Sequence, residues 1–274
     1  MNYLQFNDRG KFEPEEQALA NYFGNGNYTG FYKKHFLRDK FSITKDDFIA
    51  GDIDVMFHAM KRLGIEYSYT DYPECLKEYL YRDIWEDTLS NIKVDLFEEG
   101  YLKKPIFIKP KDDLKKFTGF VLETIDDLQN CKGASGQTKI WCCDPVRFTS
   151  EWRVLFKKKE IMPDDLNGCY YDIKITKYNK GIDNAAFAKV IEQVQNIIYT
   201  HQFEMLNKLP VAFALDLGIM TTGHVALIEM NDAFSLGLYQ NSSGTPKDEL
   251  EKHYAKCLIS RWKELVNSKE NKWS

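Results

Sequence analysis

Asp216, Glu229 and Asn231 are the residues whose types and spacing best suit chemistry in this chain. We expect the two carboxylates to face each other on neighbouring strands, with the carboxamide on the same side. Like charges directly opposite one another are destabilising, and a hard divalent cation removes that penalty. Two carboxylates and an amide oxygen, with positions left for water and phosphate, suit Mg²⁺. The alternative is that one or more of these groups caps a turn or is neutralised by a lysine from elsewhere.

A β-hairpin must position these side chains. Two apolar runs, 211–220 and 225–232, flank the polar turn Thr221-Thr222-Gly223-His224, which predicts a hairpin. A turn centred between Thr222 and Gly223 pairs Asp216 with Glu229, and Asn231 joins their face because side chains two residues apart share a face. We expect the rest of that face to be small and the other face to be buried. The small residues are Ala212, Ala214 and Gly218, and the buried ones are Phe213, Leu215, Leu217, Ile219, Ile228 and Met230.

Two cations on other predicted strands suit phosphate groups. Lys109 follows the apolar strand 106–108 and precedes Pro110, where the strand must stop. A lysine there is a compact point charge suited to nucleotide phosphates. Alternation over residues 151–156 places Glu151 and Arg153 on one face, and an arginine facing a cleft stabilises transferring phosphoryl oxygens. The alternative for Arg153 is a cross-strand salt bridge with a carboxylate.

The order of these motifs resembles the ATP-grasp superfamily. An Asp on the first strand of a terminal hairpin, followed by Glu-x-Asn on the second, is similar to its metal signature. Residues 105–110 resemble its strand with a phosphate-binding lysine, and residues 150–154 resemble its strand beyond the adenine hinge. The closest likeness is to a clade of small ATP-grasp proteins common in phages and bacteria. It covers roughly residues 48–240.

The resemblance implies a binding site for ATP with Mg²⁺. Lys109 and Arg153 would hold phosphates and act in catalysis. Cys142, Cys143 and Asp144 would lie at the adenine hinge, with Asp144 nearest the ribose. Either Trp141 or a cysteine would pack on the adenine ring.

Two further lysines are candidate phosphate ligands. Lys116 lies in residues 111–119, which correspond to the loop that closes over the phosphates in the family, although this loop holds only Gly119 where the family is often richer in glycine. Lys174 lies in the alternating run 172–178 and is a second cation for phosphate or substrate.

The remaining pattern predicts an α/β (α+β) chain. A strand at 48–50 precedes a helix that Gly64 ends, and a second helix is expected to bury Leu76, Tyr79, Leu80, Ile84 and Leu89. Asp183 is expected to cap a helix that covers the apolar side of the hairpin. By resemblance, the fold is ATP-grasp, in which two α/β lobes clasp ATP. We predict an N-terminal α/β domain over 1–100, the ATP-grasp lobes over 101–245, and a C-terminal helix over 246–274 packed on the catalytic lobe.

Composition limits the classes of function. The 274 residues are 43% hydrophobic and 14% aromatic, as in globular proteins, and the net charge of −4 argues against nucleic-acid binding as the main role. No run approaches the roughly 18 apolar residues needed to span a bilayer. The six cysteines form no CxxC pair, and the polar start resembles no signal peptide, so we expect reduced thiols in a cytoplasmic protein.

The resemblance implies an ATP-dependent ligase. It would activate a carboxylate as an acyl phosphate and join it to an amine or another nucleophile, such as an amino acid, a peptide or a protein. One alternative is a small-molecule kinase on the same fold, and another is a nucleotide-binding or protein-interaction module without turnover. A homodimer stays open.

Overall fold

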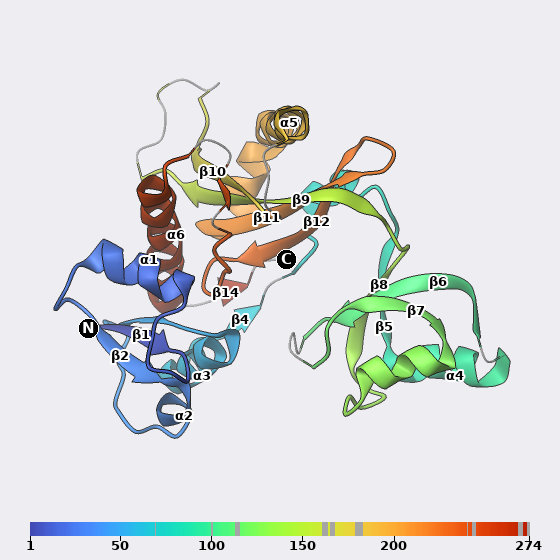
Figure 1. Ribbon diagram of the computed structural model, residues 1–274, viewed down its shortest axis with the longest axis horizontal. Coiled ribbons are helices and arrows are strands. Elements are labelled where there is room, and N and C mark those ends of the chain that lie inside the picture. The colour runs from blue at the N-terminus through green and yellow to red at the C-terminus, as the bar shows by residue number, and fades with distance from the viewer. Residues whose placement is uncertain are drawn as a thin grey trace. The chain divides into compact units, whose positions relative to one another are not determined.

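The computed structural model describes most of the chain. The residues described are 1–68, 70–99, 101–112, 116–160, 164, 168–178, 183–239, 241–242, 245–267 and 271–272, with the backbone alone for 68, 95–99, 241–242 and 271–272. Contacts group the chain into two units. One joins Met1–Tyr79 to Thr149–Ser274, and the other is Leu80–Phe148. Figure 1 shows the elements of both.

The first unit contains a small parallel sheet formed by the start of the chain. Its central strand β1 (Asn2–Phe6) pairs in parallel with β2 (Thr29–Tyr32) and with β3 (Phe48–Ala50). Parallel neighbours require a crossover connection, and α1 (Pro14–Phe23) supplies the one between β1 and β2. The short helix α2 (Lys33–Phe36) follows β2 directly.

The predicted strand and helix after residue 47 are confirmed. α3 (Ile53–Leu63) follows β3, and Gly64 ends it in the left-handed conformation at φ 63°, which glycine adopts at little cost. After α3, the short strand β4 (Tyr67–Ser68) pairs with β14 (Asn271–Lys272), and the 3-10 helix η1 (Glu74–Tyr79) completes the N-terminal part of this unit.

A larger sheet and two long helices form the rest of the first unit. Its strands lie in the order β12-β11-β9-β10-β13. Their bounds are Phe148–Lys158 for β9, Tyr171–Lys177 for β10, Ala212–Met220 for β11, Val225–Asp232 for β12 and Asn241–Ser242 for β13. The helices are α5 (Asn184–Lys208) and α6 (Lys247–Asn267).

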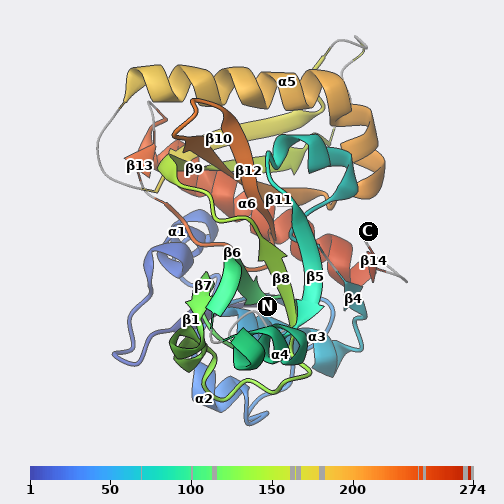
Figure 2. The same ribbon diagram turned by 90° about the vertical axis from the view of Figure 1, so that its right-hand side faces the viewer.

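The helices α5 and α6 cover opposite faces of this sheet (Figures 1 and 2). On one face, the Trp152 ring stacks on Phe187 of α5 with 5.6 Å between centroids. On the other face, His253 of α6 places Nε2 3.4 Å from the Leu155 carbonyl oxygen. Asp183 caps α5 as predicted, since its side chain accepts hydrogen bonds from the backbone of residues 185 and 186. Because α5 contacts β11 and β12, the predicted cover of the hairpin is confirmed.

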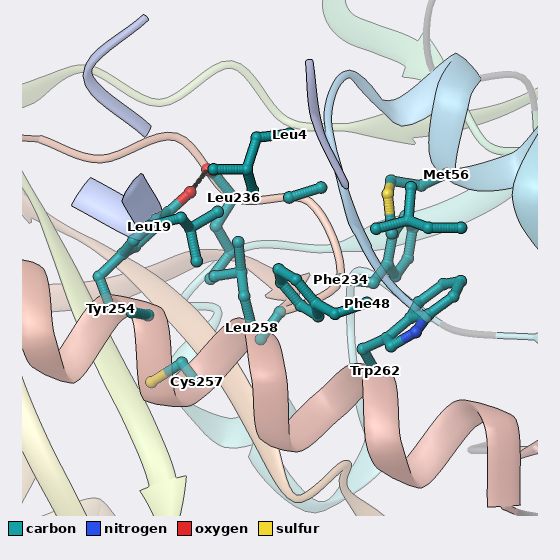
Figure 3. Packing of buried hydrophobic residues seen from close by; sticks show 14 of the residues in the cluster. Leu4, Leu19, Phe48, Met56, Phe234, Leu236, Tyr254, Cys257, Leu258 and Trp262 are labelled. Carbon is teal, nitrogen blue, oxygen red and sulfur yellow. Dashed lines mark hydrogen bonds between the residues drawn. The ribbon is translucent and has the colours of Figure 1, made fainter. Parts of the chain in front are cut away.

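The face of α6 toward the parallel sheet is apolar. Figure 3 shows Tyr254, Leu258 and Trp262 of this helix packed with Leu19 of α1 and Phe48 of β3. These contacts join the parallel sheet and the larger sheet into one hydrophobic core. The predicted stripe is buried throughout: Leu250, Tyr254, Leu258, Trp262 and Leu265.

The second unit is an antiparallel sheet with helices on one face. Its strands lie in the order β5-β8-β6-β7. Their bounds are Ile84–Thr88 for β5, Tyr101–Pro110 for β6, Phe120–Thr124 for β7 and Lys139–Cys143 for β8, with α4 at Leu89–Glu99 and the 3-10 helix η2 at Ile125–Cys131. Ile106, Ile108 and Cys142 lie in its core. The alternate residues Phe107 and Lys109 therefore lie on the other face.

The predicted helix through residues 76–89 is wrong. The segment instead contains η1, a turn in which Tyr81 has φ 49°, the strand β5 and the start of α4. Residues 84–88 are a strand because they pair with β8, from Ile84 with Cys143 to Thr88 with Lys139. Arg82 accordingly lies in the turn, and it does not lie on a helix.

The mixed helices and sheets confirm the predicted fold class. The two units divide the chain near residues 79 and 148, whereas the predicted domain boundaries were 100 and 245. Among the residues described, no helix has the length and apolar character needed to cross a bilayer.

Candidate functional site

The hairpin β11–β12 pairs Asp216 with Glu229, as predicted, but its turn is different. Ile219 pairs with Val225, which leaves a three-residue turn that ends at Gly223 with φ 91°. A β-bulge next to Asp216 takes up the extra residue. The prediction that Ile228 belongs to the buried face is wrong: Leu227 pairs with Leu217 and is buried, while Ile228 is only half-buried.

Arg153 of β9 grips Asp216 from the neighbouring strand. Its Nε and Nη2 donate to Oδ1 and Oδ2 of Asp216, each at 2.7 Å. The side chains are 7% and 15% exposed, so the pair is largely withdrawn from water. The salt bridge left open as the alternative for Arg153 is therefore present.

Asn231 joins the two carboxylates. Its Nδ2 donates to Asp216 Oδ2 at 3.0 Å and to Glu229 Oε1 at 3.2 Å. The predicted common face is thus observed, and the polar ends of all three side chains meet at one point. The repulsion between the carboxylates is relieved by one amide and one guanidinium.

Glu151 adds a third carboxylate to the electrostatics of this face. Burial raises its pKa, and the negative charges of Asp216 and Glu229 raise it further. The pKa of Arg153 is raised well above its usual range, because the bond to Asp216 outweighs burial, which acts in the opposite direction. Arg153 is therefore a permanent cation beside a carboxylate that holds its proton to higher pH than usual.

Tyr239 and Gly237 complete the surroundings of Arg153, and the sequence did not predict either contact. The Gly237 carbonyl accepts a hydrogen bond from Nη1 at 3.0 Å. The guanidinium carbon lies 4.3 Å from the centroid of the Tyr239 ring, a cation–π contact. Burial raises the pKa of Tyr239 to about 12. The signal in the sequence was weak, because residues 233–239 read only as a return from the hairpin.

The residues present fit Mg²⁺. A half-turn of the Asn231 amide replaces Nδ2 by Oδ1, and the set then offers carboxylate and amide oxygens, the donors that Mg²⁺ prefers. Within the described ranges, no three His, Cys, Asp or Glu side chains form a metal cluster. The metal set therefore depends on the Asn231 oxygen as its third ligand.

Lys174 lies on β10 beside Leu155 of β9. Its ammonium forms an ion pair with Glu249 at the start of α6. The predicted role of Lys174 as a phosphate or substrate cation remains a proposal, and it would require this surface pair to open.

The second unit presents its own cations and aromatic side chains on the sheet face away from its core. Lys109 pairs across strands with Trp141. The Lys111 ammonium lies 4.8 Å from the centroid of the Trp141 ring and also forms an ion pair with Glu86. Lys109, Lys111 and Trp141 therefore make one basic and aromatic surface.

The predicted hinge residues lie at the end of β8. Cys142 has no exposed surface, and burial raises the pKa of its thiol to about 12. Its thiol faces the core, so an adenine contact by Cys142 would use the backbone alone. Cys143 lies on the opposite face, where Phe107 is its cross-strand partner. Asp144 forms an ion pair with Lys104 at 2.6 Å.

The predicted phosphate loop 111–119 is described in part. Residues 113–115 lie outside the described residues, and Lys116 is exposed. At Gly119, an added Cβ would lie 2.5 Å from the Phe107 ring and 3.1 Å from Lys109 Cβ. The loop therefore returns directly over the side chain of Lys109, and this position tolerates no larger residue.

Comparisons with solved structures agree with this fold. N5-carboxyaminoimidazole synthase from Aspergillus clavatus, in complex with ADP and 5-aminoimidazole ribonucleotide, matches with a TM-score of 0.52 at 10% identity over 96% of this chain and 79% of that one. VanG D-Ala:D-Ser ligase from Enterococcus faecalis matches with a TM-score of 0.50 at 11% identity over 95% of this chain and 98% of that one. At such identities the likeness shows the fold alone.

No curated protein matches the chain. A family model described as an ATP-grasp domain, the second family of its clade, matches residues 79–246, more than half of the 274 residues. The matched range includes Lys109, Arg153 and the whole hairpin. The chain therefore belongs to this family of ATP-grasp domains.

Proposed function

We propose that the protein is an ATP-dependent ligase that activates a carboxylate as an acyl phosphate and passes the acyl group to an amine or another nucleophile, releasing ADP and phosphate. The observation that carries the proposal is the cluster of Arg153, Asp216, Glu229 and Asn231 on one face of an ATP-grasp sheet. The matched structures support it by name, since one is a synthase with bound ADP and another a D-Ala:D-Ser ligase.

Arg153 has donors left for a phosphate. An arginine carries five N–H donors, and three are used here, by Asp216 twice and by Gly237 once. Toward the described residues, one N–H remains on each terminal nitrogen. Two N–H groups on one rigid plane suit two oxygens of a phosphoryl group. Asp216 would thus hold Arg153 in place while Arg153 stabilises charge on the transferring group.

Asp216, Glu229 and Asn231 would hold Mg²⁺. The ion would neutralise phosphate charge and orient the phosphates. Asp216 would serve both the metal and Arg153, because each carboxylate oxygen can accept more than one partner. Lys109 would add a further point charge on the phosphates. These roles need positioning and charge neutralisation, and they need no side-chain nucleophile.

Glu151 keeps the kinase on the same fold as a second candidate. Transfer to a carboxylate needs no general base, whereas transfer to an alcohol benefits from one. Glu151 lies on the face of Arg153, and its raised pKa suits a base. The same carboxylate would accept the proton of an attacking amine in the ligase. Glu151 therefore serves both reactions, and product analysis must decide between them.

The test is a product screen with the full chain, Mg²⁺ and ATP. Amino acids, peptides and other carboxylates are supplied with hydroxylamine, which traps an acyl phosphate as a hydroxamate. We expect ADP, phosphate and a hydroxamate, all lost in Glu229→Gln. A stable phosphorylated alcohol as the sole product would favour the kinase, and release of AMP and pyrophosphate would overturn both.

A further inference from the structure

The peptide unit between Gly237 and Leu238 is held from both sides by charged groups. On its carbonyl side, the Gly237 oxygen accepts from Arg153 Nη1 at 3.0 Å. On its amide side, the Leu238 N–H donates to Glu15 Oε1 at 2.8 Å. One rigid planar unit therefore connects a carboxylate of α1 with the guanidinium of the candidate site.

The segment around this peptide is firmly anchored. The Tyr254 hydroxyl of α6 donates to the Leu236 carbonyl at 2.6 Å, and Figure 3 shows this contact between the two labelled residues. The Ser235 hydroxyl donates to the Gly51 carbonyl at 3.2 Å. Leu236 and Leu238 are buried. With both flanks fixed, the main freedom left to the peptide is its tilt, and Glu15 limits that tilt.

Gly237 fits tightly between the two charges. An added Cβ would lie 3.4 Å from Arg153 Nη1 and 3.8 Å from both Glu15 Oε1 and the Tyr239 ring. The carboxylate, the peptide and the guanidinium thus pack in direct contact.

The order of charges makes the two hydrogen bonds support each other. A carboxylate on the N–H side pulls electron density toward the carbonyl oxygen, and that oxygen then accepts more strongly from the guanidinium. Bonds with one ionised partner are stronger than neutral ones. Glu15 lies in the first turn of α1, after Pro14, so the helix start fixes where its carboxylate lies.

We propose that Glu15 is a positioning residue that sets the orientation of Arg153 through the Gly237–Leu238 peptide. Asp216 fixes one edge of the guanidinium, and Glu15 fixes Nη1 indirectly by orienting its acceptor. The terminal N–H groups assigned to the phosphate then point in one direction. This consequence for catalysis rests on the proposed function, whereas the orientation of Arg153 does not.

The test uses the full chain without ligand and reads Arg153 directly. The Arg153 Nε–H signal is observed by ¹⁵N NMR and assigned by its loss in Arg153→Lys, and the Leu238 amide is followed by hydrogen exchange. In Glu15→Ala, we expect Leu238 to exchange about tenfold faster, since a hydrogen bond to a charged group contributes about 1.5 kcal/mol. We also expect the Arg153 signal to shift and to exchange several-fold faster.

Three variants separate positioning from folding and from charge. Glu15→Gln keeps an oxygen acceptor and should restore most of the Arg153 signal. Glu15→Asp keeps the charge but is one methylene shorter, so it should resemble Glu15→Ala, and it also serves if the alanine variant does not fold. Glu13→Ala removes a carboxylate that bonds Asn7 at the surface, and it should leave both signals unchanged.

An Arg153 signal in folded Glu15→Ala and Glu15→Asp identical to that of the wild type would overturn the positioning role. The same product assay separates the two proposals. If the signal changes as expected but wild-type protein turns over no substrate, the positioning stands and the proposed function fails. If turnover occurs and the signal does not respond to Glu15, the reverse holds.

Discussion

Arg153 and Asp216 are joined by two parallel hydrogen bonds of 2.7 Å, although 63 positions separate them in the chain. This fork-to-fork geometry is the strongest form of an arginine–carboxylate contact. It supplies a positive charge beside the paired carboxylates Asp216 and Glu229. The site therefore has an internal counter-cation before any metal binds.

Replacing Arg153 by Met is expected to lower stability as well as turnover. Asp216 would be left as a largely buried carboxylate without its cation, which costs about 3 kcal/mol. Loss of a donor to the transferring group costs about 10²–10³-fold in rate. Urea unfolding and the product assay measure the two effects. Lys174→Met is the control, since its ion pair with Glu249 is half-exposed and should cost less than about 1 kcal/mol.

Glu229→Gln is expected to abolish Mg²⁺-dependent nucleotide binding while the protein stays folded. The change removes a ligand charge and also the repulsion with Asp216, so stability should be equal or higher. Calorimetric titration with ADP, with and without Mg²⁺, measures the binding. Unchanged Mg²⁺ dependence in a folded variant would refute the metal role of Glu229.

Stability should depend on pH through Glu16. Burial raises its pKa from 4.5 to about 7, with help from Glu15, Asp52 and Glu13. Between these values the folded state holds a proton that the unfolded state has lost, so stability falls as pH rises from 4.5 to 7 and is level above. Glu16→Gln should therefore gain stability over wild type across this window, by about 2 kcal/mol at pH 8. Urea unfolding at pH 4.5 and 8 measures it, and an equal difference at both pH values would contradict it.

His253 should produce the opposite slope. Burial between α6 and the sheet lowers its pKa from 6.5 to about 4. The unfolded state takes up a proton below pH 6.5 and the folded state does not until about pH 4, so stability falls as pH falls through this window. His253→Gln should remove that loss. The two slopes oppose each other between pH 4.5 and 6.5, so each single variant should reveal a tilt that the wild-type protein hides.

Lys109→Met is expected to weaken ATP binding by about tenfold, as the loss of one charge-assisted contact would. Lys103→Met is the matched control on the same strand, where the side chain is exposed. Binding of a fluorescent ATP analogue measures both. Equal affinities in the two variants would remove Lys109 from the site.

The parts of the fold that the sequence predicted are those with local signals. Gly64 after an apolar stripe, Asp183 before α5 and the period of α6 each act within a few residues. The strand β5 lacked such a signal: Ile84-Trp-Glu-Asp-Thr88 is a strand because β8 lies beside it. A tertiary partner overrode local pattern there.

The same distinction applies to the site. The common face of Asp216, Glu229 and Asn231 followed from hairpin pairing, which is local. The choice between phosphate ligand and salt bridge for Arg153 was left open, because it depends on β9 lying next to β11. The contact of Glu15 with Leu238 spans 223 positions, and no short-range pattern announces it.

The bulge beside Asp216 separates the length of the hairpin turn from the placement of the carboxylates. Without it, the three-residue turn would put Glu229 out of step with Asp216, and a one-residue slip moves a side chain to the other face. With it, the tip at residues 221–224, which is fully exposed, can be lengthened or exchanged while the acidic pair stays in place. The tip is therefore a natural position for a genetically inserted label, from which a reporter would follow the site without altering its chemistry.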